Sequence, residues 1–160
     1  MLLALALATS VMALSLGAQA HNGTHPDNSQ YDLVETPLSW NLAQAAARSL
    51  AAPGCRTAHL ATITSQGEQN IVDGLMAGSD TNAWLGGHQA GLTLDEGWHW
   101  ITGEPFAYTN WGGGEPNDTP FGTFIAGSEQ HLETLLGSGD WNDAPGFEEK
   151  YLVVESEHCD

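Results

Sequence analysis

The sequence predicts an α+β domain, and three features of the chain lead to this prediction. Two stretches in the first half carry helix-start signals. From residue 83 onward the chain changes to short apolar pieces separated by Gly, Pro, Asn and Asp, which is typical of strands and turns. Two stretches, 86–97 and 102–128, are longer than ordinary connections, and such loops in a compact domain are usually functional. We therefore expect two helices, several short strands and a large loop region.

The first half of the chain is expected to alternate strands and helices. Ser39 is suited to be the N-cap of the first helix, because a serine hydroxyl can accept a hydrogen bond from an unpaired amide of the first turn. Ser65 and Glu68 form the pattern of a capping box, which opens the second helix. The expected elements are a strand at 31–34, a helix at 40–50 stopped by Pro53-Gly54, a buried strand at 59–63, and a helix from the capping box to about Met76.

The second half is expected to consist of strands and loops. Each apolar piece is only three to five residues long and is bounded by turn-forming residues. The expected strands are 83–85, 98–100, 132–136 and 151–155.

Composition excludes one class of partner and indicates how the core is built. Twenty Asp and Glu against three Lys and Arg give a formal net charge of −17, which repels phosphate backbones and anionic lipid surfaces, so nucleic-acid binding is excluded. Six Trp and three Tyr can supply buried area that counting aliphatic residues would miss. We expect a folded acidic domain with at least five of the six Trp in its core.

The N-terminal twenty residues predict export. Residues 1–20 carry no charge, are rich in Leu and Ala and end in Ala18-Gln19-Ala20, the pattern of a signal-peptide cleavage site. The absence of Lys and Arg near Met1 leaves an uncleaved anchor open as an alternative. After cleavage, residues 21–30 form a flexible polar segment, residues 31–160 form the domain, and no later segment could span a bilayer. The protein is thus expected to be secreted to the extracellular space, or to the periplasm if it is bacterial.

Export also bears on the two cysteines of the chain, Cys55 and Cys159. In an oxidising compartment an even pair is expected to form a disulfide rather than to remain as free thiols. A single pair so far apart in sequence is not a metal-binding motif.

Oxygen-bearing side chains gather in and just after the long loops. Calcium takes six to eight oxygen ligands, and alternating carboxylates and carboxamides supply them without excessive negative charge. In an acidic chain the same Asn-Asp pairs are also common turn formers, and spacing alone leaves both interpretations open. The predicted calcium ligands are Glu115, Asn117, Glu129, Asn142 and Asp143.

From about Tyr31 to Glu155 the chain resembles a C-type lectin-like domain, because of the order in which its motifs occur. Each piece is weak evidence alone, but the set occurs in the order of that family. The matching pieces are Ser39-Trp40 with the following Ala-rich helix, His59-Leu60-Ala61-Thr62-Ile63, Ala83-Trp84-Leu85-Gly86, Trp98-His99-Trp100, Tyr108-Thr109-Asn110-Trp111, Gly114-Glu115-Pro116-Asn117, Trp141-Asn142-Asp143 and Tyr151-Leu152-Val153-Val154.

The resemblance implies a fold and a function. The implied fold has two helices flanking small antiparallel sheets, with the long loops forming one calcium-bearing face. The family's principal calcium site falls on the same five oxygen-bearing residues, and the peptide bond before Pro116 is implied to be cis. The family associates the sequence Glu-Pro-Asn with mannose-type sugars, whose vicinal hydroxyls coordinate Ca²⁺ while they exchange hydrogen bonds with the same carboxylates and amides. The expected function is therefore calcium-dependent binding of mannose-, glucose- or fucose-type carbohydrates, strengthened by avidity if the protein forms a homo-oligomer.

The chain also departs from that family. The usual two disulfides are missing, because their positions are expected to hold Ala47 and Glu155 for one and His131 and Gly146 for the other. This absence resembles bacterial relatives more than animal ones. The family's accessory calcium site would use Asp118, but the remaining positions carry no acid and are expected at Gln89, Thr93 and Gln130, so we expect a single calcium site.

The sequence also bears on two other classes of function, enzymes and binding modules that do not recognise sugar. The chain lacks the common catalytic motifs, a carboxylate pair of Glu133 and Asp143 is better explained by Asp143 as a ligand, and we do not expect an enzyme. His88, His99 and His131 lack ligand spacing and are expected to be structural. The main alternative is a C-type lectin-like module that uses its loop face for protein adhesion or ice binding without recognising sugar.

Overall fold

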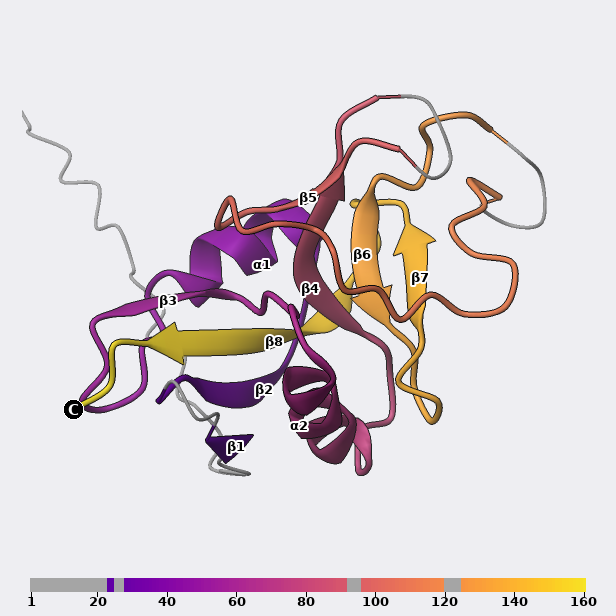
Figure 1. Ribbon diagram of the computed structural model, residues 1–160. Coiled ribbons are helices and arrows are strands. Elements are labelled where there is room, and N and C mark those ends of the chain that lie inside the picture. The colour runs from indigo at the N-terminus through magenta and orange to yellow at the C-terminus, as the bar shows by residue number, and fades with distance from the viewer. Residues whose placement is uncertain (1–22, 25–27, 92–95, 120–124) are drawn as a thin grey trace, which may run out of the picture.

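One mixed sheet and two helices make up the part of the protein that the structure describes (Figure 1). The computed structural model describes residues 23–24, 28–91, 96–119 and 125–160. The predicted signal peptide, its cleavage point and Thr93 lie outside this part of the chain. No helix within it is long and apolar enough to cross a bilayer.

The predicted elements occur in the predicted order, with strand ends that differ by a few residues, and β1 and β7 are strands that were not predicted. The segment expected to be flexible contains the two-residue strand β1, which pairs with the start of β2. The elements are β1 (Gly23–Thr24), β2 (Gln30–Leu38), α1 (Trp40–Ala47), β3 (Thr57–Leu60), α2 (Gln66–Met76), β4 (Ala83–Gln89), β5 (Trp98–Trp100), β6 (His131–Thr134), β7 (Trp141–Ala144) and β8 (Lys150–Glu157).

The strands join into a single sheet of order β1-β2-β8-β4-β6-β7, with β3 paired to β8 and β5 paired to β4. Antiparallel pairs dominate, but β4 and β8 run parallel, with Ala83 opposite Tyr151 and Trp84 opposite Leu152. This parallel pair merges the small antiparallel sheets that the sequence predicted into one surface. In Figure 1 the long strand β8 runs toward the C-terminus, while β6 and β7 lie at the other end of the sheet, beside the long loops.

The two helices begin where the sequence predicted, but only one begins with the expected cap. Ser65 and Glu68 form the predicted capping box of α2. Ser39 is the N-cap residue of α1, but its side chain makes no capping hydrogen bond. Helix α1 also ends at Ala47 rather than Leu50, because the next amides bond to carbonyls three residues back and tighten the chain into a turn.

Tryptophan side chains fill two hydrophobic clusters. Side chains alternate across β8, so that Val153 packs in the cluster that contains α2, and Leu152 and Val154 pack in the cluster that contains α1. Five of the six Trp are buried, as predicted. The buried Trp are Trp40, Trp84, Trp98, Trp100 and Trp141.

The predicted loop at 86–97 begins later than expected, because β4 continues through two glycines. A Cβ on Gly86 would lie 2.6 Å from the Leu60 carbonyl oxygen, and one on Gly87 would lie 2.7 Å from the Leu132 side chain. Glycine here lets neighbouring groups approach the backbone of a buried strand, so these residues do not mark a turn.

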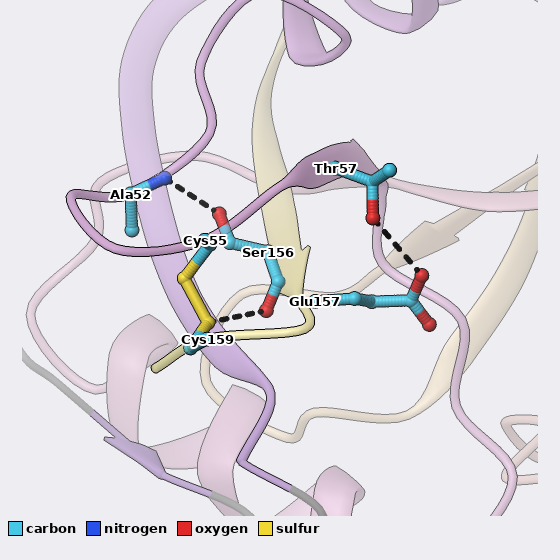
Figure 2. The surroundings of a disulfide bond; sticks show 6 residues. All are labelled: Ala52, Cys55, Thr57, Ser156, Glu157 and Cys159. Atoms are coloured by element: carbon cyan, nitrogen blue, oxygen red, sulfur yellow. Dashed lines mark hydrogen bonds between the residues drawn. A yellow bond between two sulfur atoms is a disulfide. The ribbon is translucent and has the colours of Figure 1, made fainter.

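The disulfide predicted between Cys55 and Cys159 is present and spans 104 residues. It joins the turn after α1 to the segment that follows β8 (Figure 2). Hydrogen bonds surround it: the Ala52 amide donates to Ser156 Oγ at 3.0 Å, and the Asp160 amide donates to the Gly54 carbonyl at 3.1 Å. We call this group, with the adjoining ends of β3 and β8, the disulfide end.

Of the two residue pairs expected at the positions of the missing family disulfides, one pair is adjacent in the structure and the other is not. A Cβ on Gly146 would lie 2.5 Å from His131 Cε1, so the imidazole occupies the space beside Gly146. The prediction that Ala47 and Glu155 occupy the two cysteine positions of one family disulfide is wrong. Ala47 packs in the cluster that contains Val154, whereas Glu155 accepts a hydrogen bond from the Tyr31 hydroxyl at 2.9 Å. Because side chains alternate along β8, an error of one residue moves the position to the other face of the sheet.

The three histidines predicted to be structural line up across β5, β4 and β6, with His88 opposite both His99 and His131. The rings of His88 and His99 have centroids 3.8 Å apart, and the ring of His131 is tilted against that of Trp40 with centroids 4.5 Å apart. Burial lowers the pKa of His131 to about 4, with a further contribution from His88. This histidine is therefore neutral at pH 7 and packs as an aromatic side chain.

Candidate functional site

The long loop returns to the sheet beside β7. The Gly112 amide donates to the Trp141 carbonyl at 2.9 Å, and the Trp141 amide donates to the Asn110 carbonyl at 2.8 Å. These bonds hold the segment that precedes Glu115 against the first residue of β7. The Glu115–Pro116 peptide bond is cis, as the resemblance implied.

Asp143 connects this loop to the sheet. Its side chain is buried, and its carboxylate accepts hydrogen bonds from the backbone amide of Asn117 at 3.0 and 3.1 Å and from that of Asp118 at 2.9 Å. The carboxylate of β7 thus fixes the backbone of the loop at the position of the predicted ligand Asn117.

Glu115 and Asn117 also contact each other. The Asn117 side-chain amide donates to a carboxylate oxygen of Glu115, and Asn117 Oδ1 accepts from the Thr119 amide at 2.7 Å and from the Thr119 hydroxyl. Both ends of the Asn117 carboxamide are therefore engaged within the loop, and a ligand that takes Oδ1 must displace Thr119.

Asn142 is held differently. Its Nδ2 donates to Glu133 Oε1 at 2.8 Å and to the main-chain carbonyl of Asp143 at 2.7 Å. Within the part of the chain that the structure describes, Asn142 Oδ1 accepts no hydrogen bond, so this oxygen remains available to a ligand.

Glu129 joins the group through Asp118. The Asp118 carboxylate is buried and accepts hydrogen bonds from the amides of Gly127 at 2.9 Å and Glu129 at 3.0 Å. Its backbone has a φ of +50°, a left-handed conformation that Asp tolerates better than most residues. Asp118 therefore fastens the end of the loop, and its two carboxylate oxygens, which the family's accessory calcium site would use, both accept backbone amides.

The other accessory positions within the described chain are occupied by carboxamides with partners of their own. Gln89 Nε2 donates to the Glu96 carbonyl at 2.9 Å, and Gln130 Nε2 donates to the Gly91 carbonyl at 2.6 Å. These contacts are compatible with the prediction of a single calcium site.

Burial and neighbouring charge raise the pKa of two carboxyl groups of the site, those of Glu115 and Glu129. Burial, followed by the neighbouring Asp143, raises the pKa of Glu115 to about 7. Burial and then the charge of Asp143 likewise raise the pKa of Glu129 to about 7. Acidic side chains are thus concentrated in this part of the molecule.

The donor set fits calcium in its chemistry, although it is not assembled into a finished site. Three carboxylates and two carboxamides are hard oxygen donors of the kind that Ca²⁺ takes. Among residues 23–24, 28–91, 96–119 and 125–160, however, no three His, Cys, Asp or Glu side chains are grouped closely enough to hold a metal. Asp143 acts on the pKa of Glu115 and on that of Glu129, so each of these carboxyl groups lies near Asp143, but the described side chains form no group of three.

The structure thus links Glu115, Asn117, Asn142 and Asp143 directly or through adjacent backbone, and it links Glu129 through Asp118. From the sequence, Glu133 is considered only as a partner of Asp143 in an enzyme, and its contact with Asn142 is not predicted. Glu133 lies opposite Asn142 in the β6–β7 pair. Strand pairing is the signal that could have found it, but β7 was not among the predicted strands.

Comparison with known proteins gives a family match over most of the chain. Residues 36–153 match the family described as Lectin C-type domain. The chain is also 29% identical over 116 residues to lithostathine-1 of Mus musculus, an alignment that covers 71% of this chain and 63% of that protein. The chain therefore spans less than two thirds of the length of this curated relative.

Solved structures share the fold. Human lithostathine superimposes with a TM-score of 0.69 at 20% identity and covers 86% of this chain and 88% of its own. The cow C-type carbohydrate-recognition domain of CD23, solved in the presence of a GlcNAc2Man3 oligosaccharide, gives 0.60 at 30% identity and covers 79% and 86%. A Ca²⁺-dependent type II antifreeze protein in its Ca²⁺-free form gives 0.63 at 24% identity and covers 81% and 92%.

Proposed function

The chain belongs to the C-type lectin domain family, a family of binding domains rather than enzymes, and from this premise we propose that it binds mannose-type carbohydrates in a calcium-dependent manner. The observation that carries the proposal is the bonding of the Glu115-Pro116-Asn117 segment to the Asp143 carboxylate, which gathers oxygen donors from separate stretches of the chain. The proposed ligands are Glu115, Asn117, Glu129, Asn142 and Asp143.

Each residue has a defined part in this proposal. A bound calcium ion supplies open coordination positions for the two vicinal hydroxyls of a sugar. Glu115 and Glu129 accept hydrogen bonds from the sugar hydroxyls, and the side-chain amides of Asn117 and Asn142 donate hydrogen bonds to the hydroxyl oxygens. Since both amides are now paired inside the protein, sugar binding exchanges existing hydrogen bonds for new ones. A single sugar buries little surface, so we expect a Kd near the millimolar range, about 4 kcal/mol, and useful binding only through several copies.

We also propose that the protein is exported. The bonded Cys55–Cys159 pair supports this, because disulfides persist mainly in oxidising compartments. The uncharged, Leu- and Ala-rich residues 1–20 provide the corresponding signal peptide. The missing family cysteines are the only support for placing the chain with bacterial relatives, and that placement stays a proposal.

A loop face that binds protein or ice is the competing function. The likeness to an antifreeze protein shows the shared fold, and Thr102 and Thr109 are exposed. Ice binding would need a flat, exposed array of threonines. Thr119 is half-buried, and its amide donates a hydrogen bond to Asn117, so it does not fit such an array. A thermal-hysteresis measurement, with and without calcium, separates this function from sugar binding.

The direct test is a glycan array in the presence and absence of calcium. We expect signal on mannose-type glycans that disappears with chelator. The double variant Glu115→Gln with Asn117→Asp should lose mannose-type binding and gain galactose-type binding, because it exchanges carboxylate and carboxamide at the two positions that read hydroxyl direction. An identical glycan profile for this variant would refute the proposed hydroxyl readout, and calcium-independent signal would refute the role of the metal.

A further inference from the structure

Glu133 connects the proposed site to a buried ion pair. It lies on β6 opposite Asn142 of β7, is only 3% exposed, and accepts the Asn142 side-chain amide on Oε1 at 2.8 Å. The proposed ligand function leaves this carboxylate without an assigned role.

The other carboxylate oxygen of Glu133 is also engaged. Oε2 accepts from Asn82 Nδ2 at 3.0 Å and pairs with Lys150 Nζ at 2.9 Å. Lys150 is the only lysine of the chain, is 8% exposed, pairs with Glu148 as well, and lies 5.0 Å from the ring centroid of Trp84. One of only three Lys and Arg residues in a chain of net charge −17 is therefore buried behind the proposed site.

This arrangement determines which end of the Asn142 carboxamide faces the site. A carboxylate accepts hydrogen bonds and donates none, so Nδ2 is the end that must face Glu133. Oδ1 then points away from Glu133, and within the described part of the chain it accepts no hydrogen bond. Rotating the carboxamide by half a turn would place Oδ1 against the Glu133 carboxylate, and the two oxygens would repel.

We propose that Glu133, fixed by Lys150 and Asn82, is a positioning residue that holds the Asn142 carboxamide with Oδ1 presented to the calcium site. This inference rests on the proposed function and deepens it. One Nδ2 hydrogen stays on Glu133 throughout. The other Nδ2 hydrogen is bonded to the Asp143 carbonyl oxygen, and this hydrogen bond breaks on binding. The hydrogen can then bond to a sugar hydroxyl, and the carbonyl oxygen becomes available to the cation. Partners that orient metal ligands typically alter affinity by 10- to 100-fold when they are removed.

Calcium titration calorimetry of four proteins tests the proposal. We expect Glu133→Met, which removes the acceptor, to raise the calcium Kd roughly tenfold or more. Glu133→Gln keeps one oxygen acceptor for Asn142 but sets an amide donor against Asn82 and Lys150, so it should lose less calcium affinity than Glu133→Met. Glu148→Met is the matched control, because it removes a carboxylate from the same lysine without touching Asn142, and it should leave the Kd unchanged. Wild-type affinity in Glu133→Met, or an equal loss in Glu133→Met and Glu133→Gln, would overturn the positioning role.

Side-chain amide NMR covers the case in which Glu133→Met does not fold. The Asn142 Nδ2 cross-peaks of the wild type, assigned by their loss in Asn142→Asp, should show two protons protected from solvent exchange without calcium and one after calcium saturation. Loss of both protected protons on calcium binding would overturn the inference while leaving the calcium site intact. A wild type that gives no heat and no shift with calcium would instead reject the proposed function, and with it this role.

Discussion

The disulfide end and the loop face are stabilised by different means. At the disulfide end, a covalent bond and the pairing of β3 and β2 with β8 tie together segments that are far apart in sequence. At the loop face, two buried carboxylates, those of Asp118 and Asp143, each accept two backbone amides and hold the loop against β7. The described part of the loop face contains no disulfide, since the bond at the other end uses both cysteines.

This difference indicates where a ligand can affect the protein. The disulfide end is held together by contacts within the chain. The loop face concentrates Glu115, Glu129 and Asp143, and burial with mutual repulsion raises the pKa of Glu115 and of Glu129 to about 7. A cation that offsets this charge should therefore stabilise the loop face and leave the disulfide end almost unchanged.

Removing the disulfide should have the largest effect on global stability. The bond closes a loop of 104 residues, and in the chain-entropy model a loop of that size contributes about 4–5 kcal/mol. The double variant Cys55→Ser with Cys159→Ser should lower the Tm by roughly 10–15 °C in thermal unfolding followed by circular dichroism. It should still bind calcium with the wild-type Kd, and a weakened Kd would show that the two regions are coupled.

Removing the Asp118 carboxylate should have the next largest effect. Asp118→Ala leaves the amides of Gly127 and Glu129 without their acceptor and places Ala at a left-handed backbone position, so we expect a loss of about 3 kcal/mol. Glu149→Ala, which removes an exposed carboxylate, is the matched control and should stay within about 0.5 kcal/mol of the wild type. Urea unfolding measures both, and equal midpoints would contradict the anchoring role of Asp118.

The sequence was sufficient to predict features that depend on local patterns. The capping box of Ser65 and Glu68, the two helices and the buried tryptophans were predicted from spacing and composition. Features that depend on long-range packing were not. Gly86 and Gly87 indicated a loop, because the close approach of Leu60 and Leu132 becomes visible only in the folded sheet.

The candidate site shows the same division. The five oxygen-bearing residues are proposed as ligands from the sequence, and all but Glu129 lie in the short motifs Glu-Pro-Asn and Trp-Asn-Asp. The partners that fix them were not predicted, since the contact of Glu133 with Asn142 depends on the register of β6 against β7. The misplacement of a family cysteine at Glu155 has a similar origin, because the sequence does not show which face of β8 a side chain occupies.

Calcium should give a smaller stabilisation, confined to the loop face. Binding to the folded state alone adds about 2.7 kcal/mol when free calcium is a hundred times Kd. We expect the Tm to rise with calcium and to fall back with chelator. The gain should be of similar size in the variant that lacks the disulfide, because effects at independent sites add. Unchanged melting at millimolar calcium in both proteins would remove the metal site.

The dependence of stability on pH separates the two regions by sign. Burial raises the pKa of Glu155, near the disulfide end, to about 7, as it does for Glu115 and Glu129 at the loop face. A carboxyl group with a raised pKa binds its proton more tightly in the folded state. Without calcium, stability should therefore increase as the pH falls through 7 toward the unfolded pKa of about 4.5.

Calcium should reverse this trend at the loop face only, because a bound cation requires ionised Glu115 and Glu129, and acid then competes with the metal. The Tm in calcium should consequently fall on acidification, and the opposing contribution of Glu155 should remain. In Glu155→Gln that contribution is absent, so its Tm should decrease more steeply with acid in calcium than that of the wild type. Melting curves between pH 8 and pH 5 measure both slopes, and parallel curves with and without calcium would contradict the assignment of the metal to the loop face.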